Sequence, residues 1–175
     1  VLLLEGKFKD KIWGGQRLRT EFSYDIDSDS VGEYWAISAM ENASSSIING
    51  ELAGKTLDEV YKTHKELFKD PKEDTFPLLV KIIDANKDLS IQVHPDDIMA
   101  RKLEGSRGKT ECWYALNDKE SSIVYGLNAS SKTEAIELIK SKRWDEVLRE
   151  VPAKKGDFFF VPAGTVHAIK KGCLI

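Results

Sequence analysis

The sequence predicts a mainly β fold, a barrel or sandwich that carries helical insertions. Short apolar runs of strand character recur between turn residues along its 175 residues, and two longer stretches have helical spacing. Two of the three histidines, His94 and His167, each end one of these apolar runs. Two imidazoles that separate strands deliver to one place can form a metal site inside a β-barrel, so we expect a metal-binding barrel.

The first half of the chain predicts strands and one helix. Residues 31–38 are rich in aromatic and β-branched side chains, which is typical of a strand. Residues 56–68 predict a helix, because Thr56 and Glu59 have capping-box spacing and the apolar residues that follow share one face. Residues 76–84 predict a buried strand.

The second half predicts the strands that carry the histidines, and a short helix after His94. Residues 131–150 predict a longer helix, with Ser131 and Glu134 as a second candidate capping box. Strands are expected at residues 89–93, 110–116 and 122–127 and, after a turn at residues 154–157, in a final pair. Residues 172–175 look like the start of one more strand, so we expect a barrel that is truncated at its C-terminal end and has an open edge.

Composition argues against several classes of protein. The net charge is -3 and acidic and basic residues are interleaved, which disfavours a patch for nucleic acid or a membrane surface. No apolar run approaches the ~20 residues that span a bilayer. The two cysteines, Cys112 and Cys173, are too few for a disulfide framework or a thiolate metal site, so we expect a reducing, cytoplasmic location.

The segment from Gly156 to His167 combines two glycines, a proline and a histidine at fixed spacing. We expect Gly156 to open a strand with a tight turn and residues 158–161 to pack on the barrel wall. Pro162 and Gly164 should then bend the chain so that His167 points inward. The segment resembles the second signature of the cupin barrels, and this resemblance implies a cupin fold, a jelly-roll-like β-barrel.

Gln92 and His94 occupy the place of the histidine pair in the first cupin signature. Residues two apart in a strand point to the same face, so both side chains could reach one metal ion. The next candidate ligand is Glu111. Together with His167, these residues would form a site of nitrogen and oxygen donors, which suits zinc and tolerates other divalent ions.

Each candidate ligand also has a purely structural explanation. A lone histidine in a strand is more often structural than a ligand, and only the flanking motifs favour metal binding for the two strand histidines. Gln92 could be a hydrogen-bonding residue of the core or rim, and Glu111 has little local support. His64 lies among apolar residues of the predicted helix, so we expect it to be a half-buried packing residue. Asp96 and Asp97 are more typical of charges at a helix N-terminus than of ligands.

Several segments together resemble the type I mannose-6-phosphate isomerases in their short bacterial form. These segments are residues 8–15, 32–38, 78–85, 90–97, 108–114 and 161–169. The resemblance runs in order through all 175 residues. It implies one metal-binding cupin domain over residues 1–175, with helical insertions near residues 56–68 and 131–150. The second cupin-like domain expected of the family is absent from this sequence.

The resemblance also implies an activity and a site. Members of the family interconvert mannose 6-phosphate and fructose 6-phosphate through an enediol, and they bind one zinc ion per chain. The zinc ligands would be Gln92, His94, Glu111 and His167. Ser90 and Lys109 match positions associated with substrate binding and, for Lys109, with catalysis. The expected partner is the sugar phosphate, and we expect a monomer or a weak dimer.

Elementary chemistry supports a role for Lys109. Proton abstraction next to a carbonyl develops an oxyanion, which a divalent cation can stabilise. Lys109 is two residues from Glu111 and would share its face in a strand, so its ammonium could hold the phosphate or the oxyanion.

Three alternatives stay open. The chain could be another cupin sugar-phosphate isomerase, or a non-catalytic cupin that binds a sugar in a regulatory role. Members of the family also continue well past the last ligand, and that portion supplies an acidic residue and an arginine to the active site. The 175-residue chain alone could therefore be an inactive fragment.

Overall fold

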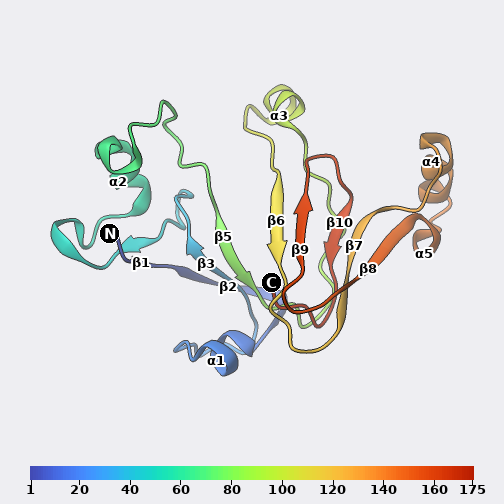
Figure 1. The fold of residues 1–175 in the computed structure, drawn as a ribbon, viewed down its shortest axis with the longest axis horizontal. Helices are drawn as coiled ribbons and strands as arrows, with labels where there is room; N and C mark the ends of the chain where they lie inside the picture. The colour runs from blue at the N-terminus through green and yellow to red at the C-terminus, as the bar shows by residue number, and fades with distance from the viewer. The chain divides into compact units, whose positions relative to one another are not determined.

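The computed structural model describes all 175 residues, which form two compact units, Val1–Asp84 and Ala85–Ile175 (Figure 1). Ten strands, five α-helices and two short 3-10 helices follow one another along the chain. Every pair of named strands is antiparallel. The predicted mainly β fold is therefore confirmed, whereas the assignment of all residues to one cupin domain stays a prediction.

The first unit contains a three-stranded sheet in the order β2-β3-β5 and a small pair, β1-β4. The strands are β1 (Leu4–Glu5), β2 (Lys7–Gly15), β3 (Val31–Ile37), β4 (Ser46–Ile47) and β5 (Val80–Ile83). Strand β3 confirms the strand predicted at residues 31–38. The buried strand predicted at residues 76–84 is wrong in extent and burial, since only β5 is regular and Val80 is 43% exposed. The reason is that β5 forms an edge of its sheet and pairs only with β3.

Helix α1 (Arg17–Phe22) was not predicted, because the residue that holds its N-terminus is distant in the sequence. The buried carboxylate of Asp84 accepts hydrogen bonds from the Arg17 backbone N–H at 2.9 Å and from Arg17 Nε at 2.7 Å. Leu18 on this helix is fully buried and packs in one cluster with Ile26 and Val31. The group that satisfies the start of α1 comes from a residue 67 positions later, so no local capping pattern marks the helix.

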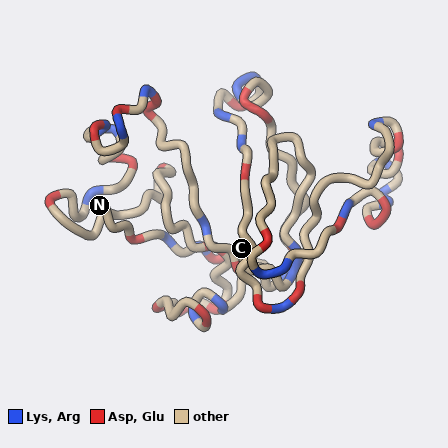
Figure 2. Tube along the Cα trace, viewed as in Figure 1, with Lys and Arg blue, Asp and Glu red and all other residues tan.

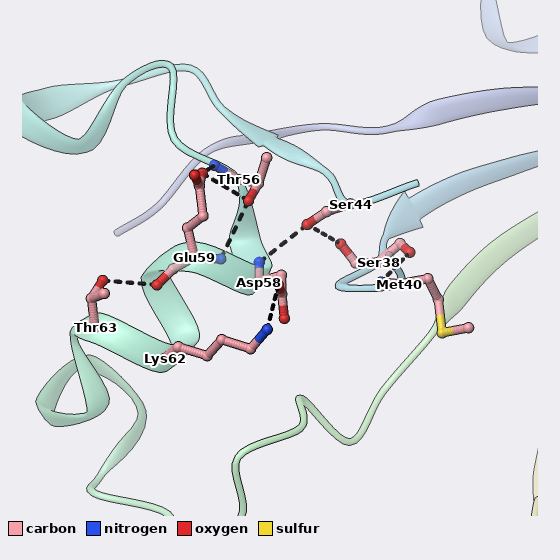
Figure 3. Close-up of polar contacts among 8 residues, drawn as sticks. All are labelled: Ser38, Met40, Ser44, Thr56, Asp58, Glu59, Lys62 and Thr63. Atoms are coloured by element: carbon pink, nitrogen blue, oxygen red, sulfur yellow. Dashed lines mark hydrogen bonds and ion pairs between the residues drawn. The ribbon is translucent and has the colours of Figure 1, made fainter. Parts of the chain in front are cut away.

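Helix α2 (Leu57–Thr63) begins with the predicted capping box (Figure 3). Thr56 Oγ1 accepts a hydrogen bond from the Glu59 backbone N–H at 3.3 Å, and Glu59 Oε2 accepts one from the Thr56 backbone N–H at 2.7 Å. The Ser44 hydroxyl accepts from the Asp58 N–H at 3.1 Å and donates to the Ser38 carbonyl at 3.2 Å. These bonds fasten the first turn of α2 to the segment that follows β3.

The predicted continuous helix over residues 56–68 is wrong at His64. His64 has a non-helical backbone (φ -133°), and the 3-10 helix η2 (Lys65–Phe68) follows it. The rings of Tyr61 and Phe68 lie 5.0 Å apart, whereas seven residues of continuous helix would separate them by about 10 Å along the axis. Aromatic packing thus stabilises the break. The His64 side chain is half-buried, as expected.

Thr56→Ala should destabilise the protein by about 1 kcal/mol, because the substitution removes the N-cap acceptor. Urea denaturation measures the change in the free energy of unfolding, with the dependence on urea concentration (the m-value) required to be the same in both proteins. Thr63→Ala in the same helix is the control, since Thr63 only donates to the Glu59 carbonyl from an exposed position (Figure 3). An equal loss of stability in both variants would contradict the capping role.

The second unit contains a three-stranded sheet in the order β10-β7-β8 and a separate pair, β6-β9. Its strands are β6 (Glu111–Tyr114), β7 (Ser121–Leu127), β8 (Leu148–Ala153), β9 (Phe158–Val161) and β10 (His167–Ile169). Strands β6 and β7 confirm two predicted strands. The predicted wall packing of residues 158–161 is wrong for half of them, because Phe158 and Phe160 are 62% and 56% exposed while Val161 is buried. Alternation along a strand sends these two rings to the other face.

The strand predicted at residues 89–93 is not regular in the structure. The segment runs beside β10, where the Leu89 N–H donates to the Ile169 carbonyl and Gln92 forms an isolated antiparallel bridge with His167. Strand β10 has only three residues, which is too short to pair with all of residues 89–93 in a regular ladder.

The helices of the second unit are α3 (Asp97–Glu104), α4 (Lys132–Lys140) and α5 (Trp144–Val147). The predicted helix over residues 131–150 is wrong in its continuity, because Lys142 adopts a left-handed backbone and the chain enters β8 at Leu148. The predicted capping box is half present. The Ser131 hydroxyl accepts from the Glu134 N–H, but the Glu134 carboxylate accepts from Ser130 instead.

The surface of both units mixes acidic and basic residues, as Figure 2 shows along the trace. No helix is long and apolar enough to cross a membrane. Both cysteines are free thiols. Cys112 lies on the opposite side of β6 from Glu111, as predicted, but it is exposed rather than packed.

Candidate metal centre

Three segments of the second unit bring His94, Glu111 and His167 together. Their candidate ligand atoms all lie within 4.8 Å of one another. His94 Nε2 is 3.6 Å from Glu111 Oε1, and His167 Nε2 is 3.5 Å from Glu111 Oε2. The carboxylate therefore lies between the two imidazoles and faces a different ring with each oxygen.

The segment before β10 orients His167. Gly164 has a positive φ of 86°, and the Thr165 N–H donates to the Pro162 carbonyl at 3.1 Å, which closes the predicted bend. His167 is 4% exposed, and its Nδ1 lies 2.8 Å from the Thr165 carbonyl oxygen. A carbonyl can only accept, so Nδ1 carries a proton, and Nε2 is the nitrogen that faces the cluster and that the neutral ring would offer to a metal ion.

Glu111 is the first residue of β6 and is half-buried. Desolvation acts to raise the pKa of its carboxyl. The hydrogen bond and the positive charge of Lys109, with smaller electrostatic contributions from the two neighbouring imidazoles, outweigh desolvation, so the pKa of Glu111 lies below its ordinary value. The group is consequently an anion at neutral pH.

Backbone pairing places Gln92 and Ser90 beside this cluster. Gln92 and His167 exchange two backbone hydrogen bonds of 2.8 and 2.9 Å, so their side chains leave the same face of the pair. The Gly164 N–H donates to the His94 carbonyl at 2.7 Å, which holds the second ligand segment against the same bend. The Gln92 amide donates to Ser90 Oγ at 3.4 Å.

Lys109 also lies in the cluster. Its Nζ is 2.9 Å from Glu111 Oε1 and 3.4 Å from His94 Nε2. Nearly half of its side-chain surface, 49%, stays exposed to solvent. The structure thus brings Lys109 and three of the four predicted ligands together, with the Gln92 backbone paired to that of His167 and Ser90 in contact with the Gln92 side chain.

The donor set fits a divalent cation. Bonds of about 2.0–2.1 Å in a tetrahedral site put neighbouring ligand atoms about 3.3 Å apart. Here each imidazole nitrogen lies 3.5 or 3.6 Å from one oxygen of Glu111, and one ligand atom from each residue lies within 4.8 Å of the others, so a modest contraction would close the set around an ion. Two imidazole nitrogens and a carboxylate are donors that suit zinc and related ions, and the orienting carbonyl behind His167 is typical of such sites.

Sequence reasoning missed two groups that shape the site. One is the backbone carbonyl of Thr165, which orients His167. Every residue has a backbone carbonyl, so no pattern in the sequence marks this one. The other is Asp97, whose Oδ1 accepts a hydrogen bond from the Gly108 N–H at 2.8 Å. Its position in the first turn of α3 agrees with the expected helix charge, but nothing local predicts the second contact.

The fold and the cluster define a mainly β protein with a candidate metal site of nitrogen and oxygen donors, and comparison with known proteins assigns the family. The chain belongs to the phosphomannose isomerase type I family, whose catalytic-domain model matches residues 1–133. The resemblance inferred from the sequence is therefore confirmed.

Curated relatives carry the same name. A mannose-6-phosphate isomerase of Streptococcus mutans is 53% identical over 175 residues, which cover 99% of this chain and 55% of that protein. A probable mannose-6-phosphate isomerase of Bacillus subtilis, GmuF, is 52% identical over 99% of this chain and 56% of its own length. The chain thus spans little more than half the length of these relatives.

Solved structures confirm the cupin fold. The crystal structure of the mannose 6-phosphate isomerase from Bacillus subtilis superposes with a TM-score of 0.95 at 49% identity, over 99% of this chain and 56% of that one. A zinc-bound mannose 6-phosphate isomerase shares the fold at 16% identity, with a TM-score of 0.69 over 99% of this chain and 66% of that one.

Proposed function

We propose that this chain carries the metal-binding part of an aldose-ketose isomerase that interconverts mannose 6-phosphate and fructose 6-phosphate through an enediol. The observation that carries the proposal is the convergence of His94, Glu111 and His167 with the Lys109 ammonium. The chain has this arrangement within a sequence about half identical to proteins named as mannose-6-phosphate isomerases.

The proposed cofactor is one Zn²⁺ per chain, held by Gln92, His94, Glu111 and His167. The name of a distantly related solved structure includes bound zinc, and the donor set here suits that ion. When bound, the ion would supply Lewis-acid stabilisation of negative charge on the sugar oxygens.

The chain's own residues would bind and orient the substrate. The Lys109 ammonium carries its protons at Nζ, on the exposed side of the cluster, where it can donate to a phosphate or to a developing oxyanion. Glu111 holds that ammonium in place through the 2.9 Å contact. Ser90, exposed next to Gln92, is the proposed hydrogen-bonding contact for the substrate.

The test is a coupled assay on the full-length protein with mannose 6-phosphate. We expect turnover that a chelator abolishes and Zn²⁺ restores. Glucose 6-phosphate is the parallel substrate, because faster turnover of that sugar would favour a different cupin isomerase. Binding of mannose 6-phosphate to the metal-loaded protein without turnover would refute the proposal in favour of a sugar-binding cupin.

Metal affinity should fall as the pH is lowered from 8 to 5, because imidazole ligands must be neutral to bind a metal ion. Glu111 should not contribute to this first loss, since its pKa lies below the ordinary carboxyl value and the group stays ionised. Calorimetric titration of the stripped protein with Zn²⁺ between pH 5 and 8 measures the effect. An affinity that is flat over this range would contradict ligation by the two histidines.

A further inference from the structure

The segment between the second and third candidate ligands forms a closed excursion. The chain leaves the cluster at His94 and returns to it at Lys109. Helix α3 lies at the tip of this excursion (Figure 1). Strand β6 begins only at Glu111, so no strand ladder fixes the backbone of Lys109. The position of the Lys109 backbone must therefore depend on individual contacts at the base of the excursion, where its two sides meet.

Two hydrogen bonds join the two sides of that base. Asp97 Oδ1 accepts from the Gly108 N–H at 2.8 Å, and the Pro95 carbonyl accepts from the Lys109 N–H at 3.1 Å. The two backbones are closely packed, because a Cβ on Gly108 would lie 2.5 Å from the Asp96 carbonyl carbon and the Asp97 nitrogen. Only glycine fits at position 108 in this geometry.

The Asp97 contact is the only one of these that uses a side chain, and it is charge-assisted. Asp97 acts on the residue directly before Lys109, whereas its neighbour Asp96 serves the helix alone. Asp96 Oδ1 accepts from the Met99 N–H at 2.8 Å as the N-cap of α3. Two adjacent aspartates thus have separable roles.

We propose that Asp97 is a positioning residue for Lys109, an inference that rests on the proposed isomerase function. The Asp97 carboxylate accepts a hydrogen bond from the Gly108 N–H and so fixes the backbone directly before Lys109. The Lys109 side chain is long and flexible, and its ammonium must contact both Glu111 and the substrate, so the position of its backbone matters. A displacement of about 1 Å in such a group can cost up to about a hundredfold in rate.

The experiment compares Asp97→Ala, Asp97→Asn and Asp96→Ala in the full-length metal-loaded protein. We expect Asp97→Ala to lower kcat about tenfold, with KM within about twofold and metal content unchanged. Asp97→Asn keeps an acceptor oxygen and should recover most of the rate. Asp96→Ala, the matched control, should lower the midpoint of thermal unfolding while kcat stays near that of the wild type.

Gly108→Ala should displace the backbone before Lys109 while Asp97 stays intact, because the added Cβ would collide with the backbone of Asp96 and Asp97. It should lower kcat at least as much as Asp97→Ala. A further readout needs no activity. In the chelator-stripped protein, hydrogen exchange at the Gly108 amide should be faster in Asp97→Ala than in the wild type and unchanged in Asp96→Ala.

Several results would overturn the inference while leaving the proposed function standing. They are a wild-type kcat in Asp97→Ala, equal losses in Asp96→Ala and Asp97→Ala, no recovery in Asp97→Asn, or loss of metal from Asp97→Ala. An inactive wild-type protein would instead refute the isomerase proposal, and the exchange rate of Gly108 would still show whether Asp97 fixes the backbone before Lys109.

Discussion

Replacing His167 with alanine is expected to release the metal ion and to lower kcat/KM for mannose 6-phosphate by about a thousandfold or more, which corresponds to about 4 kcal/mol. His167 is buried, and its Nδ1 contact with the Thr165 carbonyl fixes its Nε2 toward Glu111. Metal analysis of the purified variant and a coupled assay measure the two effects.

The controls separate loss of a ligand from loss of fold. His94→Ala should lose metal in the same way, since His94 Nε2 faces the other oxygen of Glu111. His64→Ala should keep both metal and activity, because His64 contacts Glu66 and is not among the residues gathered at the candidate centre. Far-UV circular dichroism checks that each variant folds. Full metal content in both site variants would rule out the proposed centre.

The local motifs predicted that His94 and His167 would converge, and the structure brings their candidate ligand atoms within 4.8 Å of each other and of Glu111, whereas metal binding by these residues stays a prediction. His167 follows a proline and a glycine that must bend the chain, and Gln92 and His94 have the spacing that shares one strand face. These signals act within a few residues of each ligand. The carboxylate of Glu111 was harder to assign, because its position depends on the pairing of β6 with β9, about fifty residues later in the sequence.

Elements that depend on distant partners were not predictable. Helix α1 has its N-terminal anchor in Asp84, and the break at His64 is stabilised by aromatic contacts that close only in the folded chain. The helix predicted through residue 150 enters a strand at Leu148, because the segment pairs with β7. In each case a tertiary contact overrides a local preference.

Lys109→Met should nearly abolish turnover, by about a thousandfold, while the metal stays bound. Methionine keeps much of the length and the apolar stem of lysine but removes the ammonium, so the contacts to Glu111 and His94 are lost. The substitution leaves His94, Glu111 and His167 themselves unchanged, so we expect the candidate ligand set to be retained. Loss of rate without loss of metal is the signature of a group that acts on the substrate rather than on the cofactor.

The same substitution predicts a change in the titration of Glu111. In the metal-free protein, desolvation favours the neutral carboxyl and the Lys109 ammonium opposes it, so removing the ammonium should raise the pKa of Glu111. A depressed pKa contributes stability that is present above the unfolded value and is lost as the pH falls through the folded one. The acid side of the stability profile should therefore be flatter in Lys109→Met than in the wild type.

Lys102→Met is the matched control, because Lys102 lies exposed on α3 within the same excursion. It should leave rate, metal content and acid stability unchanged. Lys109→Arg adds a charge-preserving comparison, since it keeps a cation but changes its length and shape, and it should retain more activity than Lys109→Met. Near-normal turnover in a zinc-loaded Lys109→Met protein would exclude Lys109 from catalysis and leave the ammonium as a structural partner of Glu111.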